Sequence, residues 1–399
     1  MSQLRVLHVA PSLRRSLGGL ALVPTELARS SARVGDVAEV ATTHAAGDRD
    51  EVLLPVDTRV SSFPRWGSAE QGASSSLRRW ITAHAADYDV LHIHGVFSVS
   101  TIVASRAAAR RGVPYVITPH GMLDRWALSQ KRLRKRAYLH WVGQPIFARA
   151  AAAHALTPRE LTDIRHQGMS TPTFVLPNGI DATQLNEADS RRFRDTFPPA
   201  RDRDIVLFLG RLHQKKGIDV LIDAFAAAWP ARRRPLLVVA GPGSPDFRGN
   251  LERRATLRDL HNDILFTGEL TGELKVAALK ACDVFVLPSR SEGFSVSILE
   301  ALAAGKPVVV TTSCNFPEIA SAEAGVVIPP DDIRALRDAL VNVMADATGR
   351  HEMGTRARRL VASRYDAGLL ATQLRAVYRD ILDDTRRSPA WSHDAGAAR

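Results

Sequence analysis

The stretch SEGFSVSILE, residues 291–300, places a carboxylate on each side of a predicted helix start. Backbone N–H groups in the turn after Glu292, together with the helix N-terminus, form an anion site. The turn residues are Gly293, Phe294 and Ser295. Glu300 lies about five residues into the helix, roughly 7–8 Å along its axis. The spacing suits a bound sugar–diphosphate–ribose, with Glu292 at the sugar and Glu300 at the ribose.

A second loop favours the same chemistry. In GRLHQKKG, residues 210–217, Arg211 follows a predicted strand and Lys216 precedes a predicted helix. Both groups can neutralise a diphosphate leaving group. The alternative is a set of solvated loop charges, in which Glu300 pairs with Lys306 or Arg290.

A glycine pair, Gly18–Gly19, also follows a strand and precedes a helix, so the backbone can approach a phosphate or sugar closely. The pair does not match G-x-G-x-x-G, which argues against a nicotinamide-dependent dehydrogenase.

His120 in TPHGM follows another predicted strand, where a histidine can hydrogen-bond a donor sugar or stabilise developing charge. A structural turn histidine is the alternative. His92 and His94 share one strand face and could bind a metal with His120, but no acidic cluster accompanies them. Asp-x-Asp triplets occur at 48–50, 87–89 and 202–204, none of them after a strand. We expect no metal and no cofactor besides the nucleotide sugar.

The run KRLRKR lies in a stretch with interleaved leucines and aromatics, residues 128–141. A basic amphipathic helix of this kind can bind an anionic membrane surface, and a solvated helix face is the alternative. No recognisable module indicates nucleic-acid binding. The basic residues are Lys131, Arg132, Arg134, Lys135 and Arg136.

Alternating apolar strands and helices must position these loops. Buried strands are predicted at 4–10, 88–95, 114–121, 204–210, 235–243, 264–268, 283–289 and 307–311. Helices are predicted from Val23, and at 101–111, 217–229, 273–281, 296–304 and 367–384. The pattern indicates an α/β protein with two doubly wound, Rossmann-like domains whose loops face a cleft.

The expected domains are residues 1–185 and 200–365, joined by a polar segment within 181–203. The helix at 367–384 crosses back to the first domain, and a disordered tail follows at 386–399.

Composition narrows the class of protein further. The chain has 399 residues, a net charge of +11 and two cysteines, Cys282 and Cys314. Residues 1–180 hold 22 Lys and Arg against 13 Asp and Glu, so most of the excess lies in the first half. This predicts an anionic partner for that half. The cysteine count and the short N-terminal apolar run predict a cytoplasmic protein without a signal peptide or membrane span.

The chain resembles the retaining family 4 glycosyltransferases of the GT-B fold over about residues 4–365. The resemblance rests on GG (18–19), TPHGMLDRWAL (118–128), LPNGID (176–181), GRLHQKKGID (210–219) and SEGFSVSILEALAAGKPVV (291–309). The second motif, with CNFPEI (314–319), resembles a branch that builds bacterial surface polysaccharides. Many relatives there have proline at the position of Arg125.

The resemblance implies site roles. Arg211 and Lys216 would hold the donor diphosphate, and Glu300 the ribose. Glu292 and the amides near Phe294 and Ser295 would engage sugar and phosphate, and His120 the donor sugar. The nucleotide would occupy the C-terminal domain, with its base near residues 267–270. The acceptor, a glycan or polyprenyl-diphosphate-linked sugar, would bind the N-terminal domain, with the enzyme peripheral on the inner face of the cell membrane.

The expected reaction is transfer from a UDP- or GDP-sugar with retention, by attack from the leaving-group face. Two alternatives are open: a nucleotide-sugar 2-epimerase of the same fold, and a non-catalytic nucleotide-sugar-binding protein.

Overall fold

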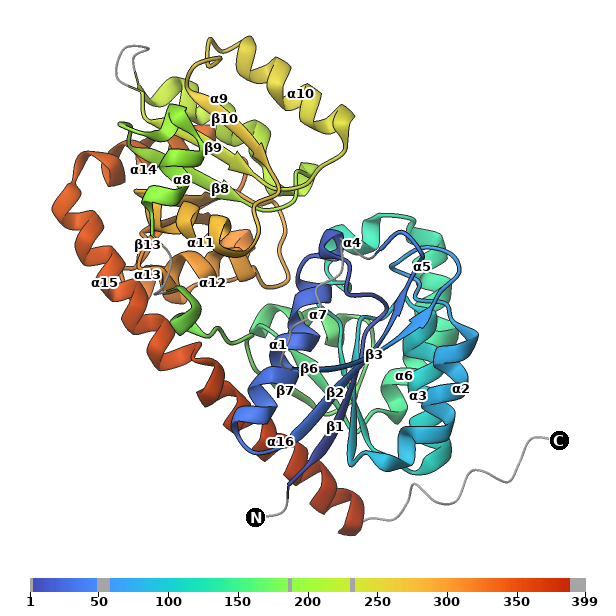
Figure 1. Ribbon diagram of the computed structural model, residues 1–399. Helices are drawn as coiled ribbons and strands as arrows, with labels where there is room; N and C mark the ends of the chain where they lie inside the picture. Colours follow the sequence, from blue (N-terminus) through green and yellow to red (C-terminus); the bar gives the residue numbers. More distant parts are fainter. Residues whose placement is uncertain (1–2, 49–57, 186–188, 230–233, 388–399) are drawn as a thin grey trace. The chain divides into compact units, whose positions relative to one another are not determined.

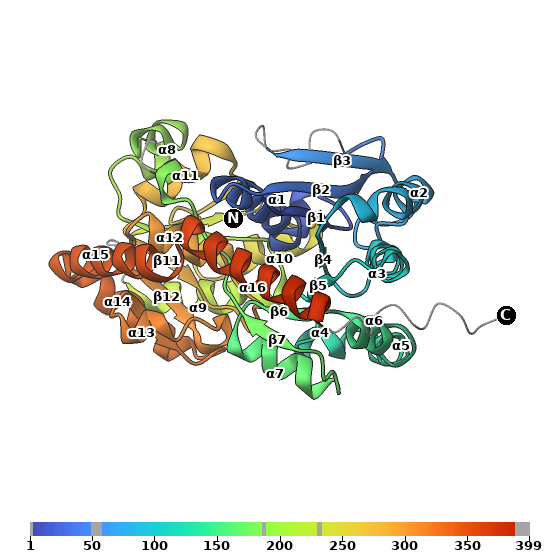
Figure 2. The same ribbon diagram turned by 90° about the horizontal axis from the view of Figure 1, so that it is seen from below.

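The protein consists of two compact units, each with its own parallel sheet (Figures 1 and 2). The computed structural model describes residues 3–48, 58–185, 189–229 and 234–387. The first unit contains the chain up to Gly179 and the helix that begins at Ala367. The second unit is the continuous segment Ile180–Asp366.

The first unit has a seven-stranded sheet in the order β3-β2-β1-β4-β5-β6-β7, with parallel neighbours throughout. Its strands are β1 (Arg5–Val9), β2 (Val37–His44), β3 (Arg59–Pro64), β4 (Val90–His94), β5 (Tyr115–Thr118), β6 (Ala152–Ala155) and β7 (Thr173–Val175). Its helices are α1 (Gly19–Arg33), α2 (Ser75–His84), α3 (Val99–Arg111), α4 (Arg125–Ser129), α5 (Arg132–Tyr138), α6 (Gln144–Arg149), α7 (Pro158–His166) and α16 (Ala367–Arg387).

Side chains alternate between the two faces of this sheet, as the two-residue period of a strand requires. Leu7 of β1 and Leu91 of β4 pack with α2 and α3 on one face. Val6 and Val90 pack with Leu374 of α16 on the other. The C-terminal helix α16 therefore completes the core of the first unit (Figure 2).

The second unit has a six-stranded parallel sheet in the order β10-β9-β8-β11-β12-β13. Its strands are β8 (Ile205–Leu209), β9 (Leu236–Ala240), β10 (Ile264–Gly268), β11 (Val284–Leu287), β12 (Val308–Thr311) and β13 (Gly325–Ile328). Its helices are α8 (Arg191–Thr196), α9 (Ile218–Ala228), α10 (Pro245–Thr256), α11 (Gly272–Ala281), α12 (Val296–Ala303), α13 (Glu318–Ser321), α14 (Ile333–Ala345) and α15 (Ala347–Arg364).

The prediction of two doubly wound Rossmann-like halves is confirmed, and the predicted strands lie within a few residues of β1, β4, β5 and β8–β12. Five strands were not predicted: β2, β3, β6, β7 and β13. Helix α1 begins at Gly19 rather than near Val23, so the second glycine of the pair lies in the helix and Gly18 is its N-cap residue.

The segment 181–203 is not a linker in the structure. It carries α8 and two short 3-10 turns, Ala182–Leu185 and Pro198–Ala200, and the fully buried Phe193 joins the core of the second unit. At the C-terminus, α16 continues to Arg387, and residues 388–399 of the expected tail lie outside the described residues. Within the described residues, no helix combines the length and apolar character needed to cross a membrane.

Candidate functional site

Two loops meet at the carboxyl ends of β8 and β11, the neighbouring central strands of the second unit. The chain order reverses between these strands, and such a switch point is where open parallel sheets bind ligands. The loop after β8 carries Arg211 and Lys216, and the loop after β11 carries Glu292. Four other predicted donor-site residues do not lie on these loops. Glu300 lies within α12, while Gly18, Gly19 and His120 belong to the first unit and are described below.

Glycine permits the close approach of these loops. A Cβ added to Gly217, whose φ is +66°, would lie 2.1 Å from the carbonyl oxygen of Pro288. A Cβ on Gly241 would similarly meet the carbonyl oxygen of Gly210 at 1.9 Å. The backbones at this edge of the sheet are therefore packed directly against one another.

Lys216 and Glu292 form a buried ion pair across the two loops. The Lys216 ammonium donates to Glu292 Oε1 at 2.6 Å, and Ser289 Oγ donates to the same oxygen at 2.6 Å. Burial alone would raise the pKa of Glu292, but the charge of Lys216, with that of Lys215 and the two hydrogen bonds, holds it below its ordinary value. Glu292 is therefore ionised and fixes the Lys216 side chain.

Arg290 ties the same loops together on their outer side. Its backbone N–H donates to Lys215 O at 2.7 Å, and its guanidinium donates to both carboxylate oxygens of Asp219 at 3.0 and 2.8 Å. Arg290 also donates to a second carboxylate, Asp331 Oδ1, at 2.7 Å. The suggested pair between Arg290 and Glu300 is thus wrong, because Arg290 is held by Asp219 and Asp331.

Helix α12 begins immediately after the Glu292 loop. Ser295 is its N-cap residue, but the Ser295 hydroxyl lies 3.1 Å from Ser297 Oγ and makes no cap hydrogen bond in the described structure. The ring of Phe294 packs against Phe316 in the interior, with ring centroids 4.6 Å apart. Phe294 therefore offers its backbone rather than its ring to a ligand, and the first amides of α12 suit an anion.

Glu300 lies on α12 and is nearly buried. Its Oε1 accepts a hydrogen bond from Lys275 of α11 at 2.6 Å. The alternative partner Lys306 is wrong, because the Lys306 ammonium donates to Lys280 O at the other end of the helix. Lys275 was not predicted as a partner, because it lies 25 residues away and no local pattern in the sequence connects it to Glu300.

In the first unit, the corresponding reversal of strand order lies between β1 and β4. Gly18 precedes α1 with φ of +62° and ψ of −130°, a conformation that side chains disfavour. Gly19 is the first residue of α1, and an added Cβ there would meet no described atom within 4 Å. The pair thus leaves an open helix N-terminus at this edge of the sheet.

His120 follows β5 and lies in the left-handed region with φ of +56°, a conformation that histidine tolerates better than most residues. The next residue, Gly121, donates its N–H to Glu160 Oε1 at 2.5 Å, which holds the turn. His120 Nε2 lies 2.9 Å from His94 Nδ1. Burial, with the nearby His154, lowers the pKa of His120 to about 3, so the imidazole is neutral at physiological pH.

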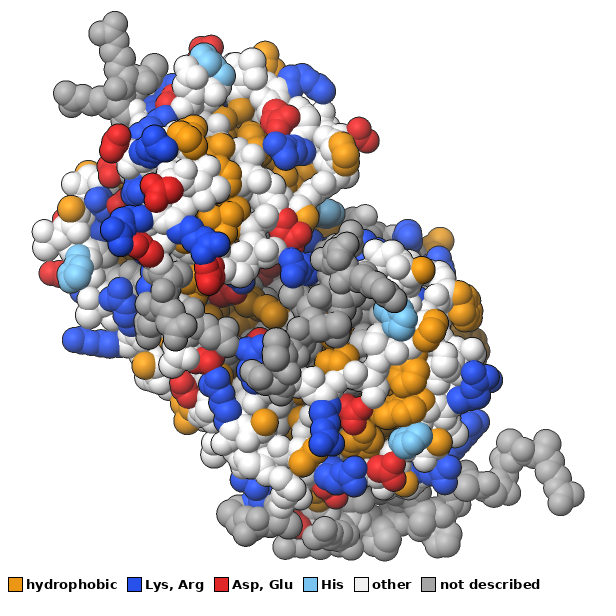
Figure 3. All heavy atoms as spheres, in the orientation of Figure 1, with side chains coloured by type: hydrophobic (Ala, Val, Ile, Leu, Met, Phe, Trp, Pro, Cys, Tyr) orange, Lys and Arg blue, Asp and Glu red, His pale blue; other side chains and the backbone are white. Residues whose placement is uncertain are grey.

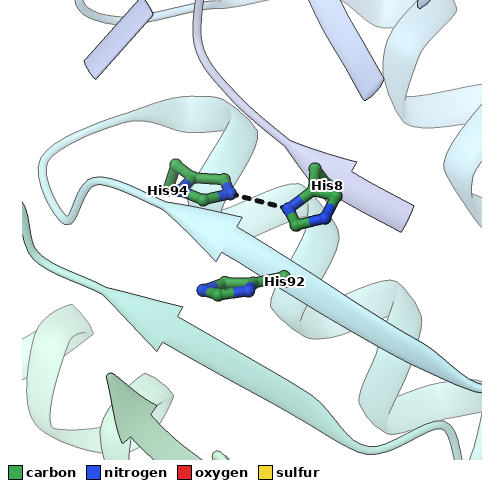
Figure 4. A group of neighbouring side chains, drawn as sticks. All are labelled: His8, His92 and His94. Atoms are coloured by element: carbon green, nitrogen blue, oxygen red, sulfur yellow. Dashed lines mark hydrogen bonds between the residues drawn. The ribbon is translucent and has the colours of Figure 1, made fainter. Parts of the chain in front are cut away.

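The three histidines expected as an alternative metal site are arranged differently in the structure. His92 and His94 group with His8 of β1, with one ring nitrogen of each within 4.8 Å of the others (Figure 4). Both ring nitrogens of His92 are already bonded, to Tyr378 Oη and Thr118 Oγ1, each at 2.6 Å. The group is therefore a hydrogen-bond network, and both ring nitrogens of His92 are already used in it and could not bind a metal ion. Of the 48–50 triplet, Asp48 pairs with Arg65, and residues 49–50 lie outside the described residues.

The basic run forms α5, which also carries an exposed leucine. Leu133 is 82% exposed, and Trp141 in the following π-helical turn, Leu139–Gly143, is 76% exposed. Lys135 is half-buried, and its ammonium donates to Ala127 O at 2.7 Å and lies 5.1 Å from the centroid of the Phe97 ring. In Figure 3, basic side chains lie beside hydrophobic ones on the visible face of this unit.

Two family models match the chain. "Glycosyl transferase 4-like domain" matches residues 18–179, and "Glycosyl transferases group 1" matches residues 189–360. A phosphatidyl-myo-inositol mannosyltransferase of Mycolicibacterium smegmatis is 28% identical over 334 residues, 83% of this chain and 79% of the relative. The O-antigen chain mannosyltransferase C of Escherichia coli is 26% identical over 391 residues, 95% of this chain and 99% of the relative.

Solved structures share the fold. Anabaena HepE, in complex with UDP and glucose, superimposes with a TM-score of 0.78 at 21% identity, covering 95% of this chain and 100% of HepE. The two doubly wound halves are therefore those of a GT-B protein. The chain belongs to the family 4 glycosyltransferases, and it is an enzyme of the glycosyltransferase class.

Proposed function

We propose that this enzyme transfers a sugar from a UDP- or GDP-sugar to a glycan or lipid-linked acceptor, with retention of anomeric configuration and without a metal ion. The observation that carries the proposal is the buried Lys216–Glu292 pair at the β8/β11 switch point, in which Glu292 belongs to the loop that leads into α12. A fixed ammonium and the first amides of a helix whose N-cap side chain makes no cap hydrogen bond together suit a diphosphate.

In this proposal the second unit binds the nucleotide sugar. Lys216, Arg211 and the first amides of α12 hold the diphosphate, and Glu300 accepts hydrogen bonds from the ribose hydroxyls. Glu292 orients Lys216 and turns its second oxygen toward the donor sugar. Together, the two cationic side chains and the helix amides stabilise the negative charge of the diphosphate, which a bound metal ion does in other transferases.

The first unit supplies His120 and the Gly18–Gly19 turn. Because His120 is neutral, it acts on the donor sugar as a hydrogen-bonding group and not as a positive charge. The helix N-terminus at Gly19 offers backbone N–H groups to a phosphate or hydroxyl. The acceptor also binds this unit, which holds most of the excess positive charge of the chain.

For the chemical step we propose attack from the leaving-group face. The acceptor oxygen forms its bond to the anomeric carbon on the side where the bond to the diphosphate oxygen breaks. The acceptor proton passes to a diphosphate oxygen, so no protein carboxylate becomes covalently attached. Lys216 and the α12 amides stabilise the negative charge that develops on the leaving group.

The relatives named above are mannosyltransferases, and HepE was solved with UDP and glucose, so both bases should be tested. A thermal-shift series would use UDP, UDP-glucose, GDP and GDP-mannose, each with and without EDTA. A ligand that binds the folded state raises the unfolding temperature. We expect one nucleoside diphosphate series to stabilise the protein irrespective of EDTA.

Lys216→Ala and Glu300→Ala should abolish the stabilisation. Lys306→Ala is the matched control, since it removes a lysine charge at the far end of α12. No shift with any series at millimolar ligand would contradict the donor site. Formation of a new nucleotide sugar without acceptor would instead indicate an epimerase, and binding with no nucleoside diphosphate release under any acceptor would indicate a non-catalytic protein.

We also propose that α5 docks the enzyme on the inner face of the cell membrane. Exposed Leu133 and Trp141 can enter the lipid interface while Arg132 and Arg134 bind anionic headgroups. A surface cavity of about 700 Å³ adjoins the helix and is lined by Arg125, Arg132, Lys135, Arg136 and Arg159 among others. Its charge suits the diphosphate of a polyprenyl-linked acceptor.

A further inference from the structure

Two chains of hydrogen-bonded side chains run across the α16 face of the first sheet. The strand sequences are RVLHV in β1, VLHIH in β4 and AAHA in β6. Because alternate residues of a strand share a face, they place His8, His92, His94 and His154 on that face. All four rings are buried. Their contacts define where each proton lies, because a neutral imidazole has one N–H donor and one acceptor nitrogen.

The first chain has a fixed direction. His154 Nε2 lies 2.7 Å from Leu176 O, which can only accept, so this nitrogen carries the proton. Thr118 then donates to His154 Nδ1 and accepts from His92 Nε2, and Tyr378 donates to His92 Nδ1. Every polar atom of this chain is satisfied, which leaves His92 unable to serve the second chain.

The second chain runs His8 Nδ1···His94 Nε2, at 3.0 Å, and His94 Nδ1···His120 Nε2, at 2.9 Å. The lowered pKa values of all three rings leave each with one proton. The three tautomers are therefore coupled. Either every ring is protonated on Nδ1 and donates toward His120, or every ring is protonated on Nε2 and donates toward His8.

The environment of His8, at one end of this hydrogen-bonded chain, distinguishes the two states. His8 Nε2 is buried and has no hydrogen-bond partner among the described residues. If the chain donated toward His8, this atom would be an N–H donor buried without an acceptor, which is rare in folded proteins. If the chain donated toward His120, the unpartnered atom would be a lone pair, which is tolerated more often.

We infer that His8 and His94 are positioning residues that hold His120 in the Nδ1–H tautomer, so that it presents a hydrogen-bond donor to the ligand. This inference rests on the proposed function for its consequence at the donor. Phosphate oxygens only accept hydrogen bonds and sugar oxygens readily do, so a donor at His120 matches a nucleotide sugar. The Gly121–Glu160 hydrogen bond fixes the turn that aims this ring.

The tautomer can be measured without substrate. Long-range proton–nitrogen correlation spectra of protein labelled with ¹⁵N-histidine distinguish a protonated from an unprotonated ring nitrogen, and the His120→Asn variant assigns the His120 signals. We expect His120 with Nδ1 protonated and Nε2 bare. The reverse pattern would overturn the inference, whether or not the protein transfers sugar.

Two substitutions of His94 separate positioning from folding. The amide nitrogen of Asn lies where Nδ1 of histidine lies, so His94→Asn retains a donor to His120 Nε2, whereas His94→Leu removes it. We expect His94→Leu to show both His120 tautomers and a kcat lowered roughly fivefold, and His94→Asn to lose less. His84 is exposed, so His84→Leu is the control and should change neither the His120 tautomer nor kcat.

Equal losses in the two His94 variants, with a single His120 tautomer in both, would also overturn the inference. Absence of sugar transfer by the wild-type enzyme would contradict the proposed function alone and leave the tautomer result standing.

Discussion

Lys216 Nζ lies 2.6 Å from Glu292 Oε1 although the two residues are 76 positions apart in the chain. Each side chain follows a different strand, and the parallel pairing of β8 with β11 brings the two loops together. The pair is buried, so water would not fully solvate either charge if its partner were removed. Its geometry therefore depends on the central two strands of the second sheet.

Glu292→Gln should destabilise the protein most near neutral pH. Removing one member of a buried ion pair leaves an uncompensated charge, and we expect a loss of about 3 kcal/mol in the free energy of unfolding of the second unit. The folded-state pKa of Glu292 lies below its ordinary value of 4.5. The carboxylate therefore stabilises the fold above that value, and the contribution is lost as pH falls through the folded-state pKa.

Urea unfolding of Glu292→Gln and wild type, at pH 7 and in steps down to pH 3, would measure this difference. The difference should shrink over the acidic steps. The exposed Glu269→Gln is the control and should match wild type at each pH. A difference that is constant over the whole range would show that Glu292 does not act through its charge.

Gly217→Ala should weaken the switch-point loops and the donor site with them. The added methyl would meet Pro288 O at 2.1 Å in a backbone with positive φ, so both a clash and strain arise. Gly272→Ala is the matched control, because it has φ of +53° and no described atom within 4 Å. We expect Gly272→Ala to cost about 1 kcal/mol and Gly217→Ala about 3 kcal/mol or more.

Chemical denaturation and the nucleotide thermal shift would be measured on both glycine variants. Gly217→Ala should lose the nucleotide response even at a temperature where it remains folded, whereas Gly272→Ala should retain it. Equal stability of the two variants would mean that the loops can separate without cost.

Reversal of two charges on α5 should weaken membrane binding. The double variant Arg132→Glu, Arg134→Glu should bind vesicles containing phosphatidylglycerol at least about tenfold more weakly, since each basic residue contributes about 1 kcal/mol. Co-sedimentation would measure this, with vesicles of phosphatidylcholine alone as the neutral reference. Arg78→Glu, Arg79→Glu is the matched control, on two exposed arginines of α2 in the same unit.

If both double variants bind equally, the attraction comes from net charge and not from α5. Retained activity on a lipid-linked acceptor, together with lost vesicle binding, would separate docking from acceptor recognition.

Much of the fold could be predicted because its central strands are continuous apolar runs, such as IVLFL in β8 and VFVL in β11. The missed strand β6 reads AAHA, and alanine carries no strand preference. Edge strand β3 reads RVSSFP and is partly exposed, so it lacks a buried pattern. Burial from the surrounding fold, rather than local propensity, makes these segments strands.

The candidate site could be predicted from residue types near strand ends, but the hydrogen-bond partners of these residues could not. Two motifs that can be recognised in the sequence alone contain the predicted donor-site residues of the second unit: Arg211, Lys216, Glu292 and Glu300. Lys275 and Arg290 act through contacts across 25 and 71 residues, respectively, which only the packed structure creates. His8 was overlooked as one histidine in an apolar strand, although its alternation with Val6 resembles that of His92 with Val90.

The return of α16 to the first unit has a consequence for synthesis on the ribosome. The second unit is one uninterrupted stretch of chain. The first unit needs Leu370, Leu374 and Tyr378 of α16 to cover its sheet, and Tyr378 also makes the hydrogen bond to His92. The half that emerges first from the ribosome is therefore the half that matures last. Until the final helix emerges, the face that carries the histidines is open to chaperones and proteases.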